Sequence, residues 1–162
     1  MFRKMRRVGQ DLPAEVIEKV LTESTSGVLA LQGDDDYPYA VPLSHIYHNG
    51  KLYFHCAHEG HKIDAINRNP KASYCIVWQD KIVAKEYTTY FQSIIAFGKI
   101  RFVTDPEEKM QAAMALVEKF SPGLFEARRG AIPALTMFCL EIEHITGKEG
   151  KALAQKRKNA EI

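Results

Sequence analysis

Residues 39–57 read YAVPLSHIYHNGKLYFHCA and decide the fold. Two arms rich in apolar and aromatic residues flank Asn49-Gly50, a dipeptide typical of two-residue hairpin turns because both positions tolerate positive φ. We therefore predict a strand over residues 39–48 and its antiparallel partner over residues 51–57. Since parallel strands need a crossover of about a dozen residues or more, this hairpin excludes a doubly wound nucleotide-binding fold here.

Further helices and strands are predicted on both sides of the hairpin. Apolar residues at helical spacing predict helices over residues 12–21, 60–69 and 105–120, the last with Asp105 as its N-cap and Glu108 three residues later. Apolar and β-branched runs predict strands over residues 27–31, 72–78, 134–145 and 87–104, the last with a bend at Gly98. Together these elements predict an α+β domain built on a six-stranded antiparallel barrel with flanking helices.

The length of 162 residues suits a single domain. We divide it into an N-terminal arm over residues 1–10, a barrel over residues 11–149 and a polar tail over residues 150–162. A hydrophobic content of 46% excludes a disordered chain, and no run approaches the roughly 20 apolar residues that span a bilayer. The basic first residues lack the apolar segment of a signal peptide, so we expect a cytoplasmic protein without a membrane partner.

Cysteines and charge suggest no further partner. Cys56, Cys75 and Cys139 are widely spaced and odd in number, which favours reduced thiols over disulfides. Residues 3–7 and 151–158 each contain four basic side chains, but no nucleic-acid-binding motif or interleaved aromatic residue accompanies them. We therefore interpret both clusters as solvated and expect no nucleic-acid partner.

Residues 55–70, HCAHEGHKIDAINRNP, concentrate the candidate ligand-binding side chains. Strand alternation places Leu52, Phe54 and Cys56 toward the core and His55 on the opposite face. At the start of the following helix, free backbone N–H groups, Gly60 and Lys62 form a possible phosphate site. The simpler alternative is that Gly60 only turns the chain and that Lys62 is solvated.

Five of the six histidines fall within residues 45–61, so a zinc site must also be weighed. His45 and His48 are three residues apart on a predicted strand, which directs their side chains to opposite faces. Structural zinc sites usually take closely spaced pairs such as H-x(3–5)-H or C-x(2–4)-C on one side of an element, which this pair does not provide. We therefore predict no metal site and interpret these histidines as having separate roles.

Two longer blocks resemble a known family. Residues 37–78, YPYAVPLSHIYHNGKLYFHCAHEGHKIDAINRNPKASYCIVW, and residues 87–103, YTTYFQSIIAFGKIRFV, resemble the flavin-binding split-barrel proteins related to pyridoxamine 5′-phosphate oxidase. Within that superfamily they are most similar to the nitroimidazole-resistance type, through YFHCAxxGHK and SxIxFGKxR. The resemblance implies a split barrel and a flavin cofactor. FMN is expected and FAD is the alternative, since one phosphate site is located.

The resemblance also implies which residues contact the flavin. The isoalloxazine ring would lie beside Val41, Pro42, Leu43 and Ser44, partly along their backbone. The ribityl chain would follow His55, Cys56 and Ala57, and the phosphate would be held by Gly60, His61 and Lys62. Because two subunits build each site in this family, the partner of a homodimer would contribute Tyr90, Phe91, Ser93 and Lys148.

A homodimer also agrees with the apolar residues on both faces of residues 87–104, since both faces must be buried. Tyr90, Phe91, Ile94, Ile95 and Phe97 would otherwise belong to the barrel core.

The resemblance implies an oxidoreductase that acts on a small-molecule substrate. In the resistance-type relatives, a nitro group on a nitroimidazole is reduced to an amine. His55 is our candidate catalytic residue, because an unperturbed pKa of about 6.5 permits proton donation or hydrogen bonding near neutral pH. The alternative is a carrier or sensor that holds flavin, deazaflavin or haem without turnover. Oxidation of B6 vitamers is not expected, since the C-terminal residues lack the arginine and histidine of the true oxidases.

Overall fold

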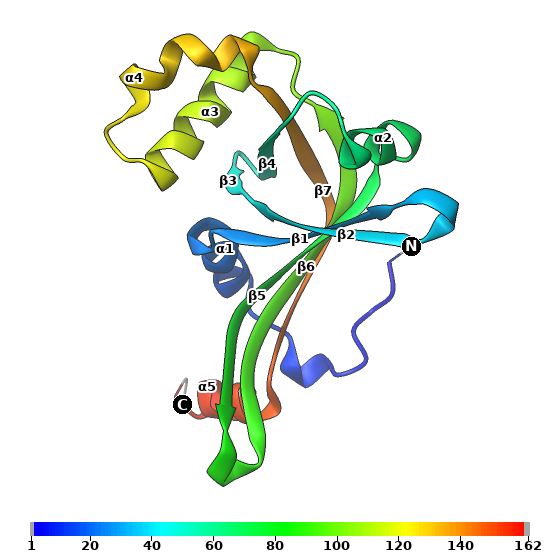
Figure 1. Cartoon of the computed structure of the whole chain (residues 1–162). Coiled ribbons are helices and arrows are strands. Elements are labelled where there is room, and N and C mark those ends of the chain that lie inside the picture. The colour runs from blue at the N-terminus through cyan, green and yellow to red at the C-terminus, as the bar shows by residue number, and fades with distance from the viewer. Residues whose placement is uncertain (1, 161–162) are drawn as a thin grey trace.

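The computed structural model describes residues 2–160 and contains one antiparallel sheet flanked by helices (Figure 1). Its strands lie in the order β2-β1-β5-β6-β7-β4-β3. They are β1 (Ser26–Gln32), β2 (Pro38–Ser44), β3 (Ile46–His48), β4 (Lys51–Cys56), β5 (Lys71–Val83), β6 (Thr88–Phe102) and β7 (Thr136–Glu149). The helices are α1 (Ala14–Glu23), α2 (His61–Arg68), α3 (Pro106–Phe120), α4 (Phe125–Arg128) and α5 (Lys151–Ala160), with 3₁₀ turns η1 (Val8–Gln10), η2 (Asp34–Asp36), η3 (Ala84–Glu86) and η4 (Arg129–Ala134).

The α+β class and the antiparallel sheet with flanking helices are confirmed, but the predicted number of six strands is wrong. The sheet has seven strands because residues 39–48 form two of them, β2 and β3, which are separated at His45. Among the described strands, β2 and β3 are the two edges and do not pair, so the sheet is not closed. They are nevertheless consecutive in the chain, so the sheet curls until its edges meet at His45.

The predicted hairpin is confirmed. Asn49 has φ 48° and Gly50 has φ 75°, and the flanking residues pair in antiparallel register, Ile46 opposite Tyr53. The bend expected at Gly98 coincides with a register shift between Phe97 and Gly98 in the β6–β7 ladder.

The strands β5 and β7 extend well beyond the predicted residues, to Val83 and Glu149. As a result, β5 and β6 form a long ribbon that projects from the body of the molecule, at the bottom of Figure 1. Its turn is η3 followed by Tyr87, a left-handed residue with φ 49°. The projecting part of this ribbon is called the arm below and comprises residues 77–92.

The sheet buries apolar side chains on both faces. The inner face of the curled sheet packs with α1 and α2, and its fully buried members include Leu29, Phe54, Tyr74, Ile94 and Phe138. The outer face carries a smaller cluster, in which α3 and η4 cover Tyr53, Val103, Met137 and Cys139. The chain therefore has two apolar layers, one on each side of β4 and β7.

The two terminal segments are more ordered than the sequence predicts. Residues 151–160 of the expected polar tail form α5. Gln10, which belongs to the expected N-terminal arm of residues 1–10, is buried, and its Nε2 donates to the Glu149 carbonyl at 3.0 Å. The cause is α5 itself, since Arg157 binds the buried carboxylate of Glu149 at 2.8 Å. Residue 1 of the predicted N-terminal arm and residues 161 and 162 of the predicted polar tail lie outside the described residues.

No helix within residues 2–160 is both long and apolar enough to cross a membrane.

Candidate functional site

The N-terminus of α2 has the geometry expected for an anion site. Gly60 adopts φ 124° and ψ 170°, a conformation that side chains other than hydrogen rarely allow, and no side chain caps the helix. Its carbonyl accepts from the N–H groups of Ile63 and Asp64, at 2.8 and 3.1 Å. The first N–H groups of the helix, at His61 and Lys62, have no acceptor within α2.

The His61 side chain is engaged elsewhere, so only its backbone N–H is available to an anion at this helix start. The imidazole stacks on Tyr39 with ring centroids 4.1 Å apart, and its Nε2 lies 3.5 Å from Asp34 Oδ2. Arg68 donates to the same carboxylate at 2.7 Å; this bond, with the nearby His61, lowers the pKa of Asp34. These contacts tie α2 to the η2 turn and fix the orientation of its N-terminus.

Cys56 and Lys62 lie on the same side of β4. The thiol is half-buried, which raises its pKa, while the Lys62 charge acts in the opposite direction. Lys62 Nζ also lies 6.0 Å from the centroid of the Phe138 ring. Ala57 follows on the exposed loop between β4 and α2.

His55 lies on the other face of β4 and is exposed, as strand alternation predicts. It forms part of the wall of a cavity of about 500 Å³ between β4, α3 and η4. The other lining residues are mostly apolar: Ala113, Leu116, Val117, Phe120, Ser121, Leu124, Ala131, Ile132 and Leu135. The cavity thus offers an apolar surface with a titratable side chain at one side, separated by β4 from Lys62.

The predicted ring-contacting segment of β2 is divided by strand alternation. Pro42 and Ser44 are exposed, whereas Val41 and Leu43 pack partly against the inner core. The Leu43 carbonyl accepts a hydrogen bond from Tyr74 Oη at 2.7 Å. Side-chain contact with a ligand on the exposed face is therefore open to Pro42 and Ser44, and Val41 and Leu43 would contribute backbone.

The remaining predicted residues gather far from α2 within one chain. Ser93 and Lys148 pair across β6 and β7, and Lys148 Nζ lies 5.8 Å from the centroid of Phe91. Tyr90 donates to Glu86 at 2.6 Å and accepts from Lys156 Nζ. Tyr90 and Phe91 belong to the arm, and Ser93 and Lys148 lie at its base. In Figure 1 the arm points away from α2. The predicted site residues thus form two groups in one chain: the α2 group, Gly60, His61 and Lys62 with Cys56, and the arm group, Tyr90, Phe91, Ser93 and Lys148. The two groups lie apart within one chain.

The histidines of residues 45–61 do not converge. Within the part of the chain that the structure describes, no three His, Cys, Asp or Glu side chains are grouped as metal ligands would be. His58 Nδ1 contacts Thr136 Oγ1, and His48 lies near the Tyr53 ring, with centroids 6.4 Å apart.

His45 is fully buried at the junction of β2 and β3, a location the sequence did not indicate. Its Nε2 lies 3.1 Å from the Leu21 carbonyl and its Nδ1 lies 2.9 Å from Tyr74 Oη. Burial lowers the pKa of His45 to about 4, although the bond to Leu21 acts in the opposite direction. The imidazole is therefore neutral at physiological pH and links the two sheet edges to α1.

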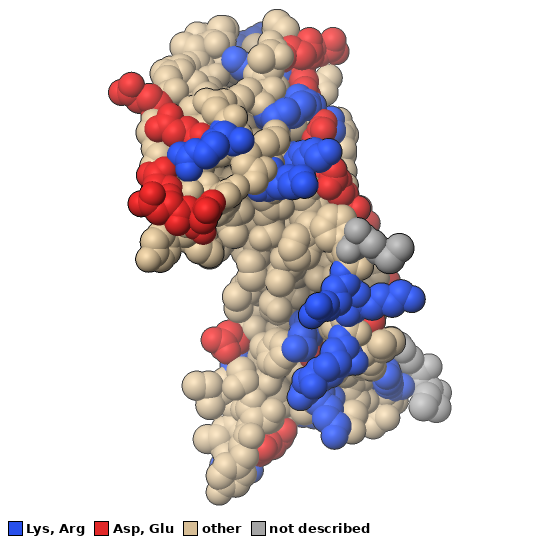
Figure 2. Space-filling model, turned by 90° about the vertical axis from the view of Figure 1, so that its right-hand side faces the viewer, with Lys and Arg blue, Asp and Glu red and all other residues tan. Residues whose placement is uncertain are grey.

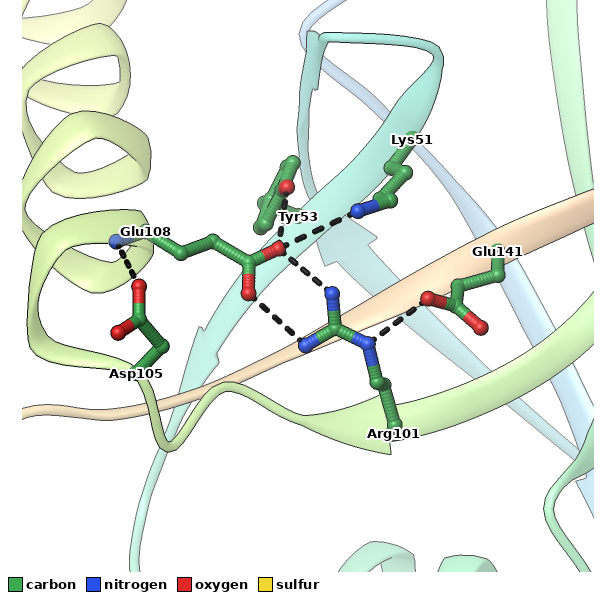
Figure 3. Close-up of polar contacts among 6 residues, drawn as sticks. All are labelled: Lys51, Tyr53, Arg101, Asp105, Glu108 and Glu141. Atoms are coloured by element: carbon green, nitrogen blue, oxygen red, sulfur yellow. Dashed lines mark hydrogen bonds and ion pairs between the residues drawn. The ribbon is translucent and has the colours of Figure 1, made fainter.

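A charged network fixes α3 to the outer face of the sheet (Figure 3). Asp105 accepts from the Glu108 N–H at 2.7 Å, which confirms the predicted N-cap. The Glu108 carboxylate does not complete a capping box; it accepts two bonds from Arg101, at 2.7 and 3.0 Å, and one from Tyr53 Oη at 2.7 Å. The bonds from Arg101 lower the pKa of Glu108 to about 2.

Sequence reasoning missed this network because its members come from four separate elements, β4, β6, α3 and β7. Glu141 adds a bond to Arg101 at 2.8 Å and Lys51 lies 3.5 Å from Glu108. The network has a consequence for the candidate site, because α3 forms one wall of the His55 cavity.

Comparison with known proteins finds several solved structures with this architecture. Solved structures with similar folds include a candidate 5-nitroimidazole antibiotic resistance protein from Bacteroides thetaiotaomicron, with 24% identity, TM-score 0.77 and coverage of 86% of each chain. An FAD-binding protein from Mesorhizobium loti has 26% identity and TM-score 0.64, over 86% of this chain and 95% of that one. The flavocytochrome Anf3 from Azotobacter vinelandii has 16% identity and TM-score 0.77, over 92% of this chain and 73% of that one.

No curated protein sequence matches the chain significantly. The family model described as pyridoxamine 5′-phosphate oxidase, in contrast, matches residues 13–149, which include the whole sheet and α1 to α4. The chain therefore belongs to the pyridoxamine 5′-phosphate oxidase family, as the sequence blocks predict.

Proposed function

We propose that this protein is a flavin-dependent oxidoreductase that binds FMN between two copies of the chain and reduces nitroaromatic compounds. The observation that carries the proposal is the uncapped N-terminus of α2, where Gly60 exposes backbone N–H groups beside Lys62. A phosphate fits this donor set, because helix N-terminal N–H groups and a lysine both favour a dianion. FMN needs one such site, and one is what α2 offers.

A homodimer would supply the residues that one chain holds too far from α2. Directly paired strand residues share a face, so Pro42, Val28, Cys75 and Ile95 form a row across β2, β1, β5 and β6. This row is partly exposed in the single chain, and Val77 beyond it is 65% exposed. An apolar strip of this kind is typical of a protein interface.

The exposed strip also connects the two groups of predicted site residues. Pro42 and Ser44 lie at one side of it, and Ser93 lies at the other, opposite Val77. Pairing two copies through this strip would bring the arm group of one chain, Tyr90, Phe91, Ser93 and Lys148, toward the α2 group of its partner. The proposed flavin site is therefore shared.

When bound, a flavin supplies the redox chemistry, and the protein supplies binding and orientation. In this proposal Lys62 and the first N–H groups of α2 hold the phosphate, and Pro42 and Ser44 lie along the ring. The imidazole of His55 donates a hydrogen bond or a proton to an oxygen of the substrate. The apolar lining of the His55 cavity favours an aromatic ring over a charged metabolite.

Cofactor identity is tested first, by the visible spectrum of the purified protein and by chromatography of the molecule released on acid treatment. We expect oxidised flavin and FMN. Released FAD would overturn the FMN assignment, and a Soret band would favour the haem alternative.

The phosphate site is tested by flavin titration of Lys62→Gln, with Lys19→Gln on the exposed face of α1 as the matched control. Loss of a charge-assisted hydrogen bond predicts a dissociation constant raised roughly tenfold or more for Lys62→Gln and unchanged for the control. Equal affinities for both variants would contradict the site.

Turnover separates an enzyme from a carrier. With reduced flavin and a nitroimidazole, we expect consumption of the nitro compound by wild type and slower consumption by His55→Gln with unchanged flavin affinity. A flavin-loaded wild-type protein that leaves the compound intact would support the carrier instead.

A further inference from the structure

We infer that the two chain termini together form a second anion site, for a phosphorylated small molecule with at least two neighbouring phosphate groups. The basic clusters at residues 3–7 and 151–158 lie far apart in sequence, yet the structure places them side by side. The hydrogen bond from Gln10 Nε2 to the Glu149 carbonyl and the isolated β-bridge between Asp11 and Lys148 hold the N-terminal segment against the end of β7 and α5. Figure 2 shows Lys and Arg side chains gathered over this part of the surface.

A cavity of about 470 Å³ separates the N-terminal segment from α5. Its charged lining residues are Arg7, Lys151 and Lys158, and no acidic residue lines it. Gly9 also lines the cavity, with Lys158 Nζ 3.8 Å from the position that a Cβ would occupy there. Gln10, Ala154 and Gln155 complete the lining.

Within the described residues, no ion pair neutralises Arg7, Lys151 or Lys158. Among residues 2–160, neither Lys151 nor Lys158 forms an ion pair, and Arg7 hydrogen-bonds to Gln10 Oε1 at 3.4 Å. Two of the nearby acids are already engaged: Glu149 with Arg157, and Glu86 with Lys156 and Tyr90. Three like charges that share a cavity without a counterion are unfavourable, and a bound anion would offset their repulsion.

The start of α5 adds to this argument. Its first turn contains no acidic residue and begins with Lys151, although the positive end of a helix favours negative charge. The whole helix, KALAQKRKNA, carries four basic residues and no acid. An anion held near Lys151 would therefore be attracted by the positive end of the helix as well as by that side chain.

The lining favours a small phosphate ester over a polymer. No aromatic side chain lines the cavity to stack on a base, and no large apolar side chain lines it to enter a lipid layer. The polar groups that remain, Gln10 and Gln155, suit the hydroxyl groups or amides that accompany phosphates in a nucleotide. The proposal does not depend on flavin binding.

The test is calorimetric titration of the full-length protein with inorganic pyrophosphate and with ADP. We expect binding by wild type that weakens roughly tenfold or more in the Lys151→Gln, Lys158→Gln double variant, and that also weakens with added salt. The matched control is the Lys19→Gln, Lys109→Gln double variant, which loses the same charge from α1 and α3 and should bind as wild type does.

Lys62→Gln distinguishes this site from the flavin phosphate site, because pyrophosphate affinity at the terminal cavity should survive that substitution. Loss of binding in Lys62→Gln alone would overturn the inference, as would equal loss in the two double variants. If only a DNA duplex or phosphatidylglycerol vesicles bound through Lys151 and Lys158, while pyrophosphate did not, the small-molecule assignment would be wrong.

Discussion

The outer face of β6 has two halves with the same strand alternation and different surroundings. At one end, Arg101 and Val103 lie beneath α3, held by the bonds from Arg101 to Glu108. At the other end, Ile95 and Ser93 point the same way, but no helix among residues 2–160 covers Ile95, which is 37% exposed. One half is completed within the chain, and we propose that a second copy completes the other. In this proposal α3 covers one half of the outer face of β6 within the chain, and a second copy covers the other half.

The sharpest contrast is between neighbouring residues of β6. Ile94 is 1% exposed on the inner face, so Ile94→Ala should lower the free energy of unfolding by about 2–5 kcal/mol. For Ile95→Ala, measured by urea unfolding at a concentration low enough to keep the protein monomeric, we expect a loss below about 1 kcal/mol. Similar losses for both variants would show that the single chain already buries both faces.

The inner face also carries a pH-dependent contribution at His45. Its pKa falls from 6.5 to about 4 on folding, so the unfolded chain takes up this proton first as the pH falls. The free energy of unfolding should therefore decrease between pH 6.5 and pH 4, on the order of 3 kcal/mol in total from this group. His45→Asn should flatten this slope, measured by urea titrations across the range, whereas His48→Asn should leave it. An unchanged slope in His45→Asn would place the pH dependence elsewhere.

The uncovered half is tested by Ile95→Lys. If two copies pair through the exposed strip, a lysine there must be desolvated in the interface, and the dimer dissociation constant should rise roughly 100-fold. Light scattering and analytical ultracentrifugation over a concentration series measure this. Lys substitution at Met114, an exposed apolar residue of α3 away from the strip, is the control. Monomeric wild type at micromolar concentration would contradict the dimer.

The covered half is tested by Glu108→Gln, which removes one charge from the network of Figure 3. We expect a loss of about 1–2 kcal/mol, smaller than for Ile94→Ala because these groups remain partly solvated. The pKa of Glu108 is lowered from 4.5 to about 2, so its contribution is complete above pH 4.5 and disappears as the pH falls toward 2. In Glu108→Gln that part of the acid sensitivity should be absent, whereas Glu107→Gln, exposed on the same helix, should retain it.

Local signals predicted much of this molecule. Asn49-Gly50, the Asp105 cap and the alternation of Leu52, Phe54 and His55 are governed by backbone geometry within a few residues, and the structure confirms all three. The start of α2 at Gly60 follows from the same kind of signal.

Features that depend on distant parts of the chain were missed. The break at His45 requires Leu21 and Tyr74, and α5 requires Glu149 and the N-terminal segment. Likewise, Glu108 fits a local capping box but is bound by Arg101, which belongs to another element. For the candidate site, sequence blocks named both groups of residues, but their separation within one chain became visible only in three dimensions.

The open sheet has a consequence for self-association. A sheet with free edges can recruit further strands, yet β3 has only three residues and β2 carries prolines at positions 38 and 42, which lack an N–H donor. Neither edge presents a full ladder to an incoming strand. Growth into fibrils is thereby disfavoured at both edges. The proposed contact between copies uses the side-chain face of the sheet instead, where pairing would be complete after one partner.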